Sequence, residues 1–490
     1  MLATSDTAWS VRRWASEWGW DNPNRAACTS CICSGLHDGV LDWLVYSSAA
    51  DSFVWLPGVG AVSLGQRKRR IQFCSEKGGG FIRGSVNWKN TLAYRKGACQ
   101  PASNCRIRIH RSNPKRPGRY LMYRAAVIGL GRMGSTFDDE ISSGGAIFLP
   151  YCHAPSYAAS PYTELVAGAD LHAEQGAIFA DRWGLDQEHI YGDYREMLAA
   201  ERPDIVSICT TARHRAAIIQ DAIQAGVKAI WAEKPLTLSL AEADAIIELS
   251  ARNSVAIAVN CSRRHSPFLT EARRMAQSGE LGDILQITAY TECYISHNGS
   301  HAIDTMRYLV DGDVEWVFGE MESDEEAAGE EDLMGNGYLA FDNGVRGYIR
   351  AMPTGIAPWE FDLIGTEGRV RSLSNGAETQ YYRWVPGGLR DEGLPARAPF
   401  PLPLSIQGTG LSVIADLVNA IETGSDPRCS AEDGRKALEI AIAMRESHRQ
   451  GGRRVDLPVA DRSLRILSVE IGGDAVPARV RRLQQEPVVA

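Results

Sequence analysis

The sequence predicts an α/β protein built on a doubly wound parallel sheet. Two observations lead to this fold class. A short apolar run over residues 125–128 leads directly into glycines at 129, 131 and 134, and strand-like and helix-like segments then alternate as far as residue 259. A buried strand followed by G-x-G-x-x-G is typical of a dinucleotide-binding turn. Alternating elements of this length predict parallel strands joined by right-handed crossovers.

The alternation continues element by element beyond the glycines. Strands are expected at residues 164–170, 204–209, 228–232 and 255–259. Helices are expected between them at residues 173–183, 215–225 and 240–251. The second of these helices stops before Gly226, and glycine commonly follows the last helical residue. We therefore place a nucleotide-binding Rossmann domain at residues 122–260.

The length and composition agree with a multidomain globular protein. A chain of 490 residues is about three times a domain length of ~150 residues. Its 44% hydrophobic and 23% charged residues exclude collagen-like, wholly disordered and disulfide-scaffold classes. No uncharged apolar stretch reaches the roughly 18 residues of a membrane span, and the first residues lack the apolar core of a secretory signal. These features predict a soluble, cytoplasmic protein.

The first 121 residues differ in charge from the rest of the chain. They carry 18 Lys and Arg against 7 Asp and Glu, although the net charge of the chain is -8. Such asymmetry indicates a separate module or tail, and the acidity of the remainder argues against a nucleic-acid partner. The segment shows no sustained helix or strand periodicity. We treat it as an unassigned basic extension, either disordered or upstream of a functional start near Met122.

Cys28, Cys31 and Cys33 give the sharpest pattern in this extension. C-x-x-C spacing suits zinc, but a structural zinc site needs four ligands, and a second such pair is missing from the sequence. A basic nucleic-acid arm at residues 67–70 is a further alternative. We favour the interpretation in which neither these cysteines nor residues 67–70 form a binding site.

The glycine turn supplies the first candidate binding residues. Gly129, Gly131 and Gly134 would allow a tight turn and the close approach of a pyrophosphate, with Arg132 and Met133 between them. The N-terminus of the following helix would then bind that anion. The turn therefore predicts a dinucleotide cofactor.

Asp170, at the end of the second predicted strand, is the candidate ligand of the cofactor ribose. A carboxylate there favours NAD because it repels the 2′-phosphate of NADP. It lies 36 residues beyond Gly134, against roughly 20 in the standard unit. Residues 135–160 therefore look like an insertion near the pocket mouth. In the alternative interpretation Asp170 is an ordinary residue of a turn, which leaves NADP open as the cofactor.

An ordered set of motifs extends beyond the nucleotide-binding domain. Glu233, Lys234 and Pro235 directly follow the predicted strand at residues 228–232. The later motifs are Asn260 with Arg263, Arg264 and Pro267, Gly299 with His301 and Asp304, and residues 341–345, 363–368, 430–447 and 455–458. As a set they resemble the glucose–fructose oxidoreductase / inositol dehydrogenase (Gfo/Idh/MocA) family. The resemblance covers residues 123–458.

The resemblance implies a second, α+β domain with an open, mostly antiparallel sheet. We place this substrate and oligomerisation domain at residues 261–458 and a C-terminal tail at 459–490. Strand-like segments at residues 285–294, 337–341, 345–351 and 360–364 agree with it. The segment 320–332, with eight carboxylates, is expected to be a solvated excursion. The resemblance also implies a homo-oligomer, a dimer or tetramer, that pairs through the open sheet face.

The chemistry implied by the resemblance is hydride transfer between NAD(P) and a secondary hydroxyl of a sugar, cyclitol or related polyol. Such a reaction needs a donor on the hydroxyl oxygen and a base for its proton. Lys234 is the candidate donor, and His301 is the candidate base, since imidazole exchanges protons near neutrality. Asp304, one helical turn later, would contact substrate or orient the imidazole. Thr210 and Glu233, with Lys234, are the candidates on the cofactor side.

Two residues leave the identity of the substrate open. His297 stands where many members of the family carry an acidic residue four positions before the histidine, so it is a candidate substrate contact. A metal site is not expected beside it, because no third ligand is near in the sequence. Arg264 would either bind an anionic or polyhydroxyl substrate or pair with a carboxylate.

A further departure concerns the nicotinamide side. The family usually carries a proline, an asparagine and a histidine where this chain has Thr211, Ala212 and Arg215. Two alternatives to a polyol dehydrogenase therefore stay open. One is a non-catalytic nucleotide-sensing regulatory protein, because fold does not fix function. The other is an imine or enal reductase on the same scaffold. In each case the expected ligands are NAD(P) and a small molecule, without a membrane partner.

Overall fold

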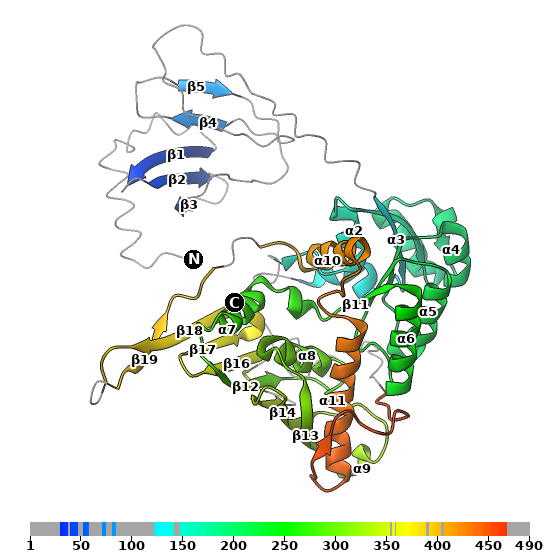
Figure 1. Cartoon of the computed structure of the whole chain (residues 1–490). Coiled ribbons are helices and arrows are strands. Elements are labelled where there is room, and N and C mark those ends of the chain that lie inside the picture. The colour runs from blue at the N-terminus through cyan, green and yellow to red at the C-terminus, as the bar shows by residue number, and fades with distance from the viewer. Residues whose placement is uncertain are drawn as a thin grey trace, which may run out of the picture. The chain divides into compact units, whose positions relative to one another are not determined.

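The computed structural model describes residues 30–37, 40–47, 52–57, 71–74, 81–84, 122–141, 148–352, 355–357, 359–388, 392–402 and 406–467. The chain divides into two compact units, Met1–Pro117 and Gly118–Ala490 (Figure 1). None of the described helices is long and apolar enough to cross a membrane.

The first unit contains a five-stranded sheet that sequence periodicity did not indicate. Its strands are β1 (Ser30–His37), β2 (Val40–Ser47), β3 (Ser52–Pro57), β4 (Ile71–Cys74) and β5 (Phe81–Gly84), in the order β3-β2-β1-β4-β5. β1 and β4 are parallel, and the other neighbours are antiparallel. Cys28 and residues 67–70 lie outside the described residues. The start of the functional protein near Met122 stays a prediction.

The second unit opens with a six-stranded parallel sheet, which confirms the doubly wound fold. Its strands are β6 (Tyr123–Ile128), β7 (Thr163–Ala169), β8 (Ile190–Tyr191), β9 (Ile205–Ile208), β10 (Ala229–Ala232) and β11 (Ala256–Val259). Their spatial order is β11-β10-β9-β6-β7-β8, so the direction of winding reverses between β6 and β9. Ligands of such sheets bind at the carboxyl ends of the strands beside this reversal.

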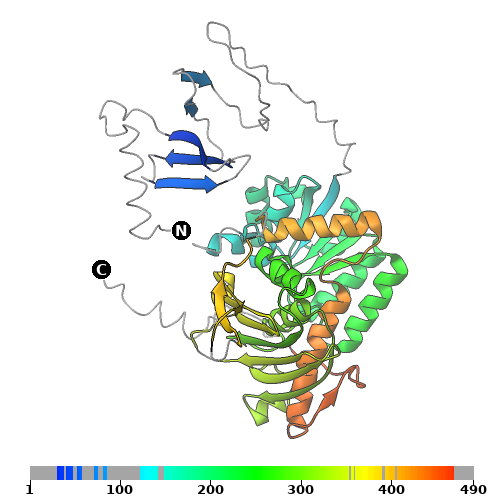
Figure 2. The ribbon, with the colours of Figure 1, turned by 60° about the vertical axis from the view of Figure 1, so that its left-hand side comes forward.

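Helices pack on both faces of this sheet (Figures 1 and 2). They include α3 (Ala173–Trp183), α4 (Tyr194–Glu201), α5 (Ala212–Gln224) and α6 (Leu240–Asn253). A helix from much later in the chain, α10 (Thr409–Thr423), also packs against it. Val413, Ile414 and Leu417 of α10 share a buried cluster with Val127 and Trp231 of the sheet. The C-terminal part of the chain thus completes the core of the nucleotide-binding sheet.

The segment after the glycine turn differs from the expected helix. It forms one turn of π-helix, η2 (Arg132–Thr136), and one turn of 3-10 helix, η3 (Phe137–Glu140). The residues that follow include two serines and two glycines at 142–145, which are poor helix formers. The helix expected after the glycines is therefore present as two short turns of other helix types, and its binding of the pyrophosphate stays a prediction. Farther along the supposed insertion, α2 (His153–Ala159) packs against β6, β7 and α10, so this part belongs to the core.

A nine-stranded sheet forms the rest of the second unit and confirms the open, mostly antiparallel sheet. It comprises β12 (Ile284–Thr291), β13 (Val314–Met321), β14 (Gly335–Phe341), β15 (Arg346–Ala351), β16 (Glu360–Gly365), β17 (Gly368–Leu373), β18 (Glu378–Val385), β19 (Leu394–Ala398) and β20 (Val455–Asp456). The order is β19-β18-β17-β16-β12-β15-β14-β13-β20. Only the central pair β12 and β15 is parallel.

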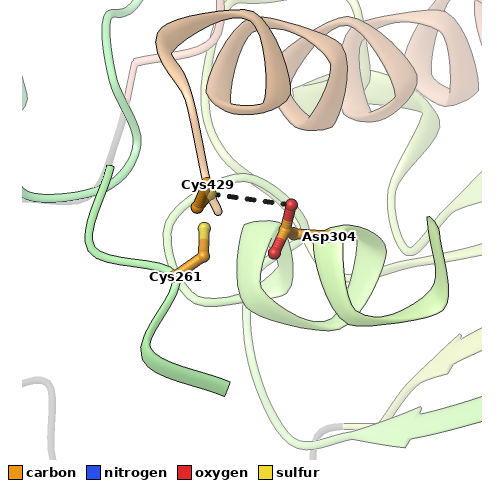
Figure 3. A group of neighbouring side chains, drawn as sticks. All are labelled: Cys261, Asp304 and Cys429. Carbon is orange, nitrogen blue, oxygen red and sulfur yellow. Dashed lines mark hydrogen bonds between the residues drawn. The ribbon is translucent and has the colours of Figure 1, made fainter. Parts of the chain in front are cut away.

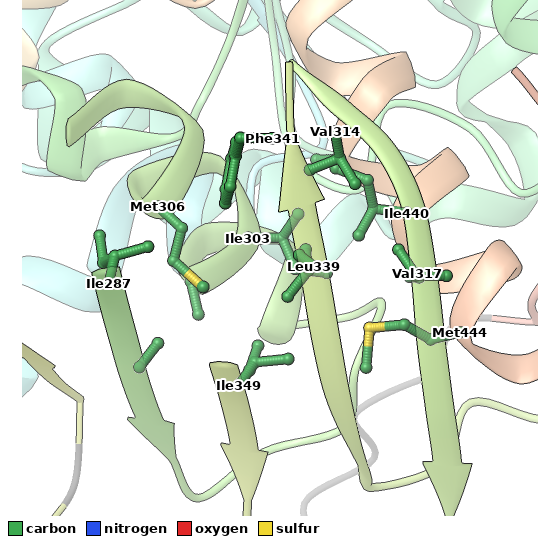
Figure 4. Close-up of a cluster of buried hydrophobic side chains, with 14 of the residues drawn as sticks. Ile287, Ile303, Met306, Val314, Val317, Leu339, Phe341, Ile349, Ile440 and Met444 are labelled. Carbon is green, nitrogen blue, oxygen red and sulfur yellow. The ribbon is translucent and has the colours of Figure 1, made fainter. Parts of the chain in front are cut away.

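Two helices cover one face of this sheet and bury its core. They are α8 (Gly299–Val310) and α11 (Ala431–Arg449), while α7 (Pro267–Gln277) packs beside α8 and α9 (Asp324–Ala327) beside α11. Figure 4 shows Ile303 and Met306 of α8 and Met444 of α11 directed at Leu339 and other side chains of the strands. Burial of α8 on this face fixes the position of its first turn, which carries His301.

Candidate active site

A cleft of about 940 Å³ lies at the carboxyl ends of the parallel strands. Gly131 follows β6, Thr210 follows β9, Lys234 follows β10 and Asn260 follows β11, and all four line the cleft. His301 and other residues of the second domain line it as well. The cleft is therefore built by both sheets, at the position where the winding of the parallel sheet reverses.

The three glycines of the turn have different steric reasons for lacking a side chain. Gly129 has a φ of +90°, and a Cβ there would lie 2.9 Å from the carbonyl carbon of Cys209. A Cβ on Gly134 would lie 2.1 Å from the oxygen of Gly129. Nothing lies within 4 Å of a Cβ built on Gly131, which faces the cleft. The first and third glycines thus form the turn, and the second leaves open the space that a pyrophosphate needs.

Asp170 contacts the glycine turn itself. Its Oδ2 accepts a hydrogen bond from the backbone N–H of Leu130 at 2.8 Å, and its Oδ1 accepts one from His172 at 2.9 Å. The structure therefore shows the turn contact, and a contact with ribose stays a proposal. Arg132 and Met133 line the cleft, where Arg132 forms a two-bond pair with Glu140 at 2.6 and 2.7 Å.

Glu233 is a buried carboxylate held by groups from two other segments. Its Oε1 accepts a hydrogen bond from Asn260 Nδ2 at 2.6 Å and lies 3.2 Å from His153 Nε2. Burial raises the pKa of Glu233, but the contact with His153, the charge of Lys234 and the amide of Asn260 outweigh it and lower the pKa to about 2. Glu233 is therefore an anion beside Lys234.

His153 is a partner of the site that sequence reasoning missed. It stacks on Trp231 with ring centroids 3.7 Å apart, and its Nδ1 lies 2.7 Å from Ser207 Oγ. The hydroxyl of Tyr157 contacts the same Ser207 oxygen at 2.8 Å. These contacts join positions 50 and 54 residues apart. Because no short-range pattern links such positions, the sequence held no signal for them.

Lys234 spans the cleft to the second domain. Its Nζ donates hydrogen bonds to the carbonyl oxygen of His297 at 3.1 Å and to Asn298 Oδ1 at 2.7 Å. Burial lowers the pKa of Lys234, while the charge of Glu233 raises it. Arg215, which stands where the family usually carries a histidine, donates hydrogen bonds to the carbonyl oxygens of Thr210 and Pro235. It therefore joins the loop after β9 to the loop after β10.

His301 lies in the first turn of α8 and lines the cleft together with His297. Its ring meets the indole of Trp359 edge-on, with centroids 6.1 Å apart. Burial, together with the charges of Arg263 and Lys234, lowers the pKa of His301 well below its ordinary value. The imidazole is therefore neutral at physiological pH and able to accept a proton.

His297 is held by a carboxylate that was expected to be solvated. Its backbone N–H donates to Asp332 Oδ2 at 2.6 Å, and the N–H of Ser296 donates to Asp332 Oδ1 at 2.8 Å. Asp332 is 3% exposed, so the expectation of a solvated excursion is wrong for the last of its eight carboxylates. Burial, chiefly, lowers the pKa of the His297 side chain to about 3, so this ring is neutral as well.

The structure does not bring Asp304 and Arg264 to the cleft. Asp304 is fully buried and accepts hydrogen bonds from Arg264 Nη2 at 2.7 Å and Nε at 2.9 Å. Arg264 also pairs with Asp433 at 3.0 Å, as does Arg307. Of the two expectations for Arg264, pairing with a carboxylate is the one observed. The carboxylate of Asp304 is engaged by Arg264, and among the described residues no hydrogen bond joins it to His301.

Cys261 and Cys429 lie beside Asp304, with ligand atoms all within 4.8 Å of one another (Figure 3). Arg264 occupies both oxygens of the carboxylate, where a cation would have to bind. Burial raises the pKa of the Cys429 thiol well above its ordinary value, which opposes the thiolate form that a metal requires. The arrangement therefore fits a buried ion pair packed on thiols better than a metal centre.

Comparisons with known proteins agree with this architecture. The sequence model of an oxidoreductase family with an NAD-binding Rossmann fold matches residues 123–261, and that of the family's C-terminal alpha/beta domain matches residues 292–457. The scyllo-inositol 2-dehydrogenase (NAD(+)) of Bacillus subtilis is 27% identical over 371 residues, covering 67% of this chain and 94% of that protein. The D-apiose dehydrogenase of Paraburkholderia graminis is 26% identical over 318 residues, covering 59% and 82%.

A solved structure shares the fold. The inositol dehydrogenase homolog of Azotobacter vinelandii, complexed with NADH and myo-inositol, superposes with a TM-score of 0.55 at 19% identity. The match covers 69% of this chain and 98% of that one.

The glycine turn gives a matched pair of variants. Gly134→Ala should destabilise the protein by about 1–3 kcal/mol or more, because its Cβ meets backbone and cannot be accommodated by a side-chain shift. Gly131→Ala should leave the melting temperature unchanged and weaken NADH binding, because its Cβ enters open space in the cleft. Thermal unfolding and NADH fluorescence titration measure the two effects. Equal melting temperatures for both variants would contradict the assignment.

Asp304→Asn separates a structural from a catalytic role. Replacing the carboxylate leaves Arg264 and Arg307 with one fewer buried counter-charge, so stability should fall by about 3–5 kcal/mol. The folded fraction, assayed at low temperature, should keep a kcat close to that of the parent. His301→Asn is the matched control and should lower kcat without a comparable loss of stability. A stable Asp304→Asn protein with a collapsed kcat would restore the catalytic interpretation.

Proposed function

This chain belongs to the Gfo/Idh/MocA family of oxidoreductases, and we propose that it transfers a hydride between NAD and a secondary hydroxyl of a sugar, cyclitol or related polyol. The observation that carries the proposal is the meeting of Lys234 and His301 in one cleft beside the glycine turn. The relatives that act on scyllo-inositol and D-apiose support the substrate class.

The side chains of the cleft suit the proton transfer of this reaction. Lys234, whose protonated form the charge of Glu233 favours against burial, would donate a hydrogen bond to the substrate oxygen and stabilise the negative charge that develops there. His301, which is neutral, would accept the hydroxyl proton as the hydride leaves the same carbon. NAD, when bound, supplies the hydride acceptor. Asn298 and the His297 carbonyl hold Lys234 at the substrate side of the cleft before substrate arrives.

The cofactor contacts follow from the positions of the remaining residues. We place the pyrophosphate at Gly131, with Arg132 and Met133 beside it, and the nicotinamide near Thr210 and Glu233. Asp170, ordered by the glycine turn, would accept hydrogen bonds from the ribose and disfavour the 2′-phosphate of NADP. The relatives give no support to an imine or enal reductase or to a nucleotide-sensing regulatory protein.

The open face of the nine-stranded sheet supports a homo-oligomer, as a dimer or tetramer. Trp316, Phe318, Tyr338 and Tyr348 form a continuous aromatic cluster on the face away from α11, with neighbouring centroids 5.1–6.1 Å apart. Phe318 and Tyr348 are 40% and 41% exposed. Exposed apolar patches of this kind mark association surfaces, and a second copy would cover this one.

The first test measures reduced-nicotinamide absorbance with NAD and a panel of cyclitols and sugars. Turnover is expected for the parent, and Lys234→Met should lower kcat by at least about 100-fold, the scale of one lost transition-state donor. NADH titration of the variant controls for folding and cofactor binding. No turnover of any panel member by a folded, NADH-binding parent would contradict the proposal.

The pH dependence follows from the shifted pKa values. His301 acts when neutral, and its lowered pKa predicts that kcat/KM stays constant on the acid side down to below about 6.5. Lys234 acts when protonated, and its lowered pKa predicts that kcat/KM falls with rising pH before about 10.5. An acid limb centred above about 7 would exclude His301 as the base.

The oligomer is tested by light scattering after size-exclusion chromatography. Phe318→Glu places a charge in the aromatic cluster and should shift the mass toward that of the monomer. Ile178→Glu, a similar change on exposed α3, is the matched control and should leave the mass unchanged. A monomeric parent protein would contradict the proposed interface.

A further inference from the structure

Two neighbouring arginines in this structure have opposite electrostatic surroundings. Arg264 is paired with Asp304 and Asp433. Arg263 donates one hydrogen bond, from Nη2 to Asn375 Oδ1 at 2.8 Å, and its guanidinium lies over the Trp359 ring at 4.0 Å from the centroid. Among the described residues Arg263 forms no ion pair with a carboxylate, and its Nε and Nη1 donate no hydrogen bond.

Arg263 lies at the substrate side of the cleft. It lines the cleft together with His301, and the indole of Trp359 contacts both side chains, Arg263 on its face and His301 at its edge. Burial lowers the pKa of Arg263 to about 10, because only thiols and the Tyr151 hydroxyl, and no carboxylate, offset it. It is therefore a half-buried cation without a carboxylate partner among the described residues, and it lies beside the proposed base.

The rest of the cleft is poor in negative charge. Five described cationic side chains line it, and Glu233 is the single carboxylate among the described lining residues. The cations are Arg132, Arg213, Arg215, Lys234 and Arg263. Glu140 pairs with Arg132, and Glu233 lies in the field of Arg215 and Lys234. His297, one turn before the base, is neutral and does not repel an anion. Arg263 is only partly buried, but no carboxylate of the described residues pairs with it, so an anionic group of a ligand in the cleft would form its ion pair.

On the basis of the proposed dehydrogenase function, we propose that Arg263 binds a carboxylate of the substrate, so that sugar acids, uronic or aldonic, are preferred over neutral sugars and cyclitols. The planar guanidinium is suited to hold two carboxylate oxygens. The indole beneath it and the Asn375 hydrogen bond fix its plane, which places the acid group on the same side as His301. The other source of an anion at Arg263 is a phosphate of NAD.

The experiment compares acids with neutral amides of the same carbon skeleton. D-Glucuronate and D-galacturonate are paired with D-glucuronamide and D-galacturonamide, and D-gluconate and myo-inositol are added. The full chain is assayed with NAD by absorbance, and binding of each acid and amide to NADH-loaded protein is measured by calorimetry. One charge-assisted pair is worth a factor of about 10–100, so at least one acid should exceed its amide by that factor in kcat/KM and in affinity.

Variants assign the preference to Arg263. Arg263→Gln should bring the acid-to-amide ratio to about 1 and leave the Kd of NADH unchanged, and Arg263→Lys should keep part of the ratio. His297→Asp should lower the acid kcat/KM more than the amide kcat/KM, because it introduces a repelling carboxylate. Arg350→Gln, on β15 and bonded to Asn336, is the matched control and should keep the parent ratio.

The outcomes separate this inference from the proposed function. Turnover of myo-inositol without any preference for acids, or a preference that survives Arg263→Gln, overturns the inference and leaves the dehydrogenase intact. A weaker NADH Kd in Arg263→Gln assigns the arginine to a cofactor phosphate and also overturns it. If no compound turns over, the proposed dehydrogenase function is contradicted, and the calorimetric binding of the acids still tests the carboxylate site at Arg263. Acid binding that Arg263→Gln abolishes supports the site, and no acid binding refutes it.

Discussion

The carboxylate of Glu233 is buried in the wall of the cleft, and an unpaired charge there would cost several kcal/mol. Its partners come from separate segments: Asn260 at the end of β11, His153 on α2, and the backbone of Lys234. These segments must meet before the carboxylate is satisfied. Lys234 then lies beside this carboxylate, whose charge favours the protonated amine against the effect of burial, while Asn298 holds it toward the second domain.

The same rule for buried charge separates structure from function at Arg263 and Arg264. Arg264 meets its counter-charges within the fold, so it stabilises the junction of η6 (Ser262–His265), α8 and α11. Arg263 meets an aromatic face and an amide, and it pairs with no carboxylate of the described residues, so its charge is open to an anion in the cleft. Two adjacent arginines thus have different roles because their surroundings differ. A sequence motif that contains both cannot predict this difference.

The sequence was sufficient for features that depend on local patterns. The glycine turn, the alternation of residues 123–259 and the Glu-Lys-Pro tripeptide are contiguous, and each has a local steric or topological reason. It was insufficient where a side chain pairs across the fold. Asp304 looked catalytic from its spacing to His301, yet its partner Arg264 lies 40 residues away. His153 and Asp332 act through contacts with distant segments. The motif also does not distinguish the π-helical and 3-10 turns that follow the glycines from a regular α-helix.

The electrostatics of the cleft also connect the proposed substrate to the proposed base. Burial lowers the pKa of His301, and the charges of Arg263 and Lys234 lower it further, so its imidazole is by itself a weak base. A carboxylate bound to Arg263 would offset one of these two charges and raise the pKa of His301 toward the neutral range, where a general base is most effective. A neutral substrate would leave both charges acting on the imidazole. The carboxylate of an acidic substrate would thereby both favour its binding at Arg263 and make His301 a stronger base for the proton transfer.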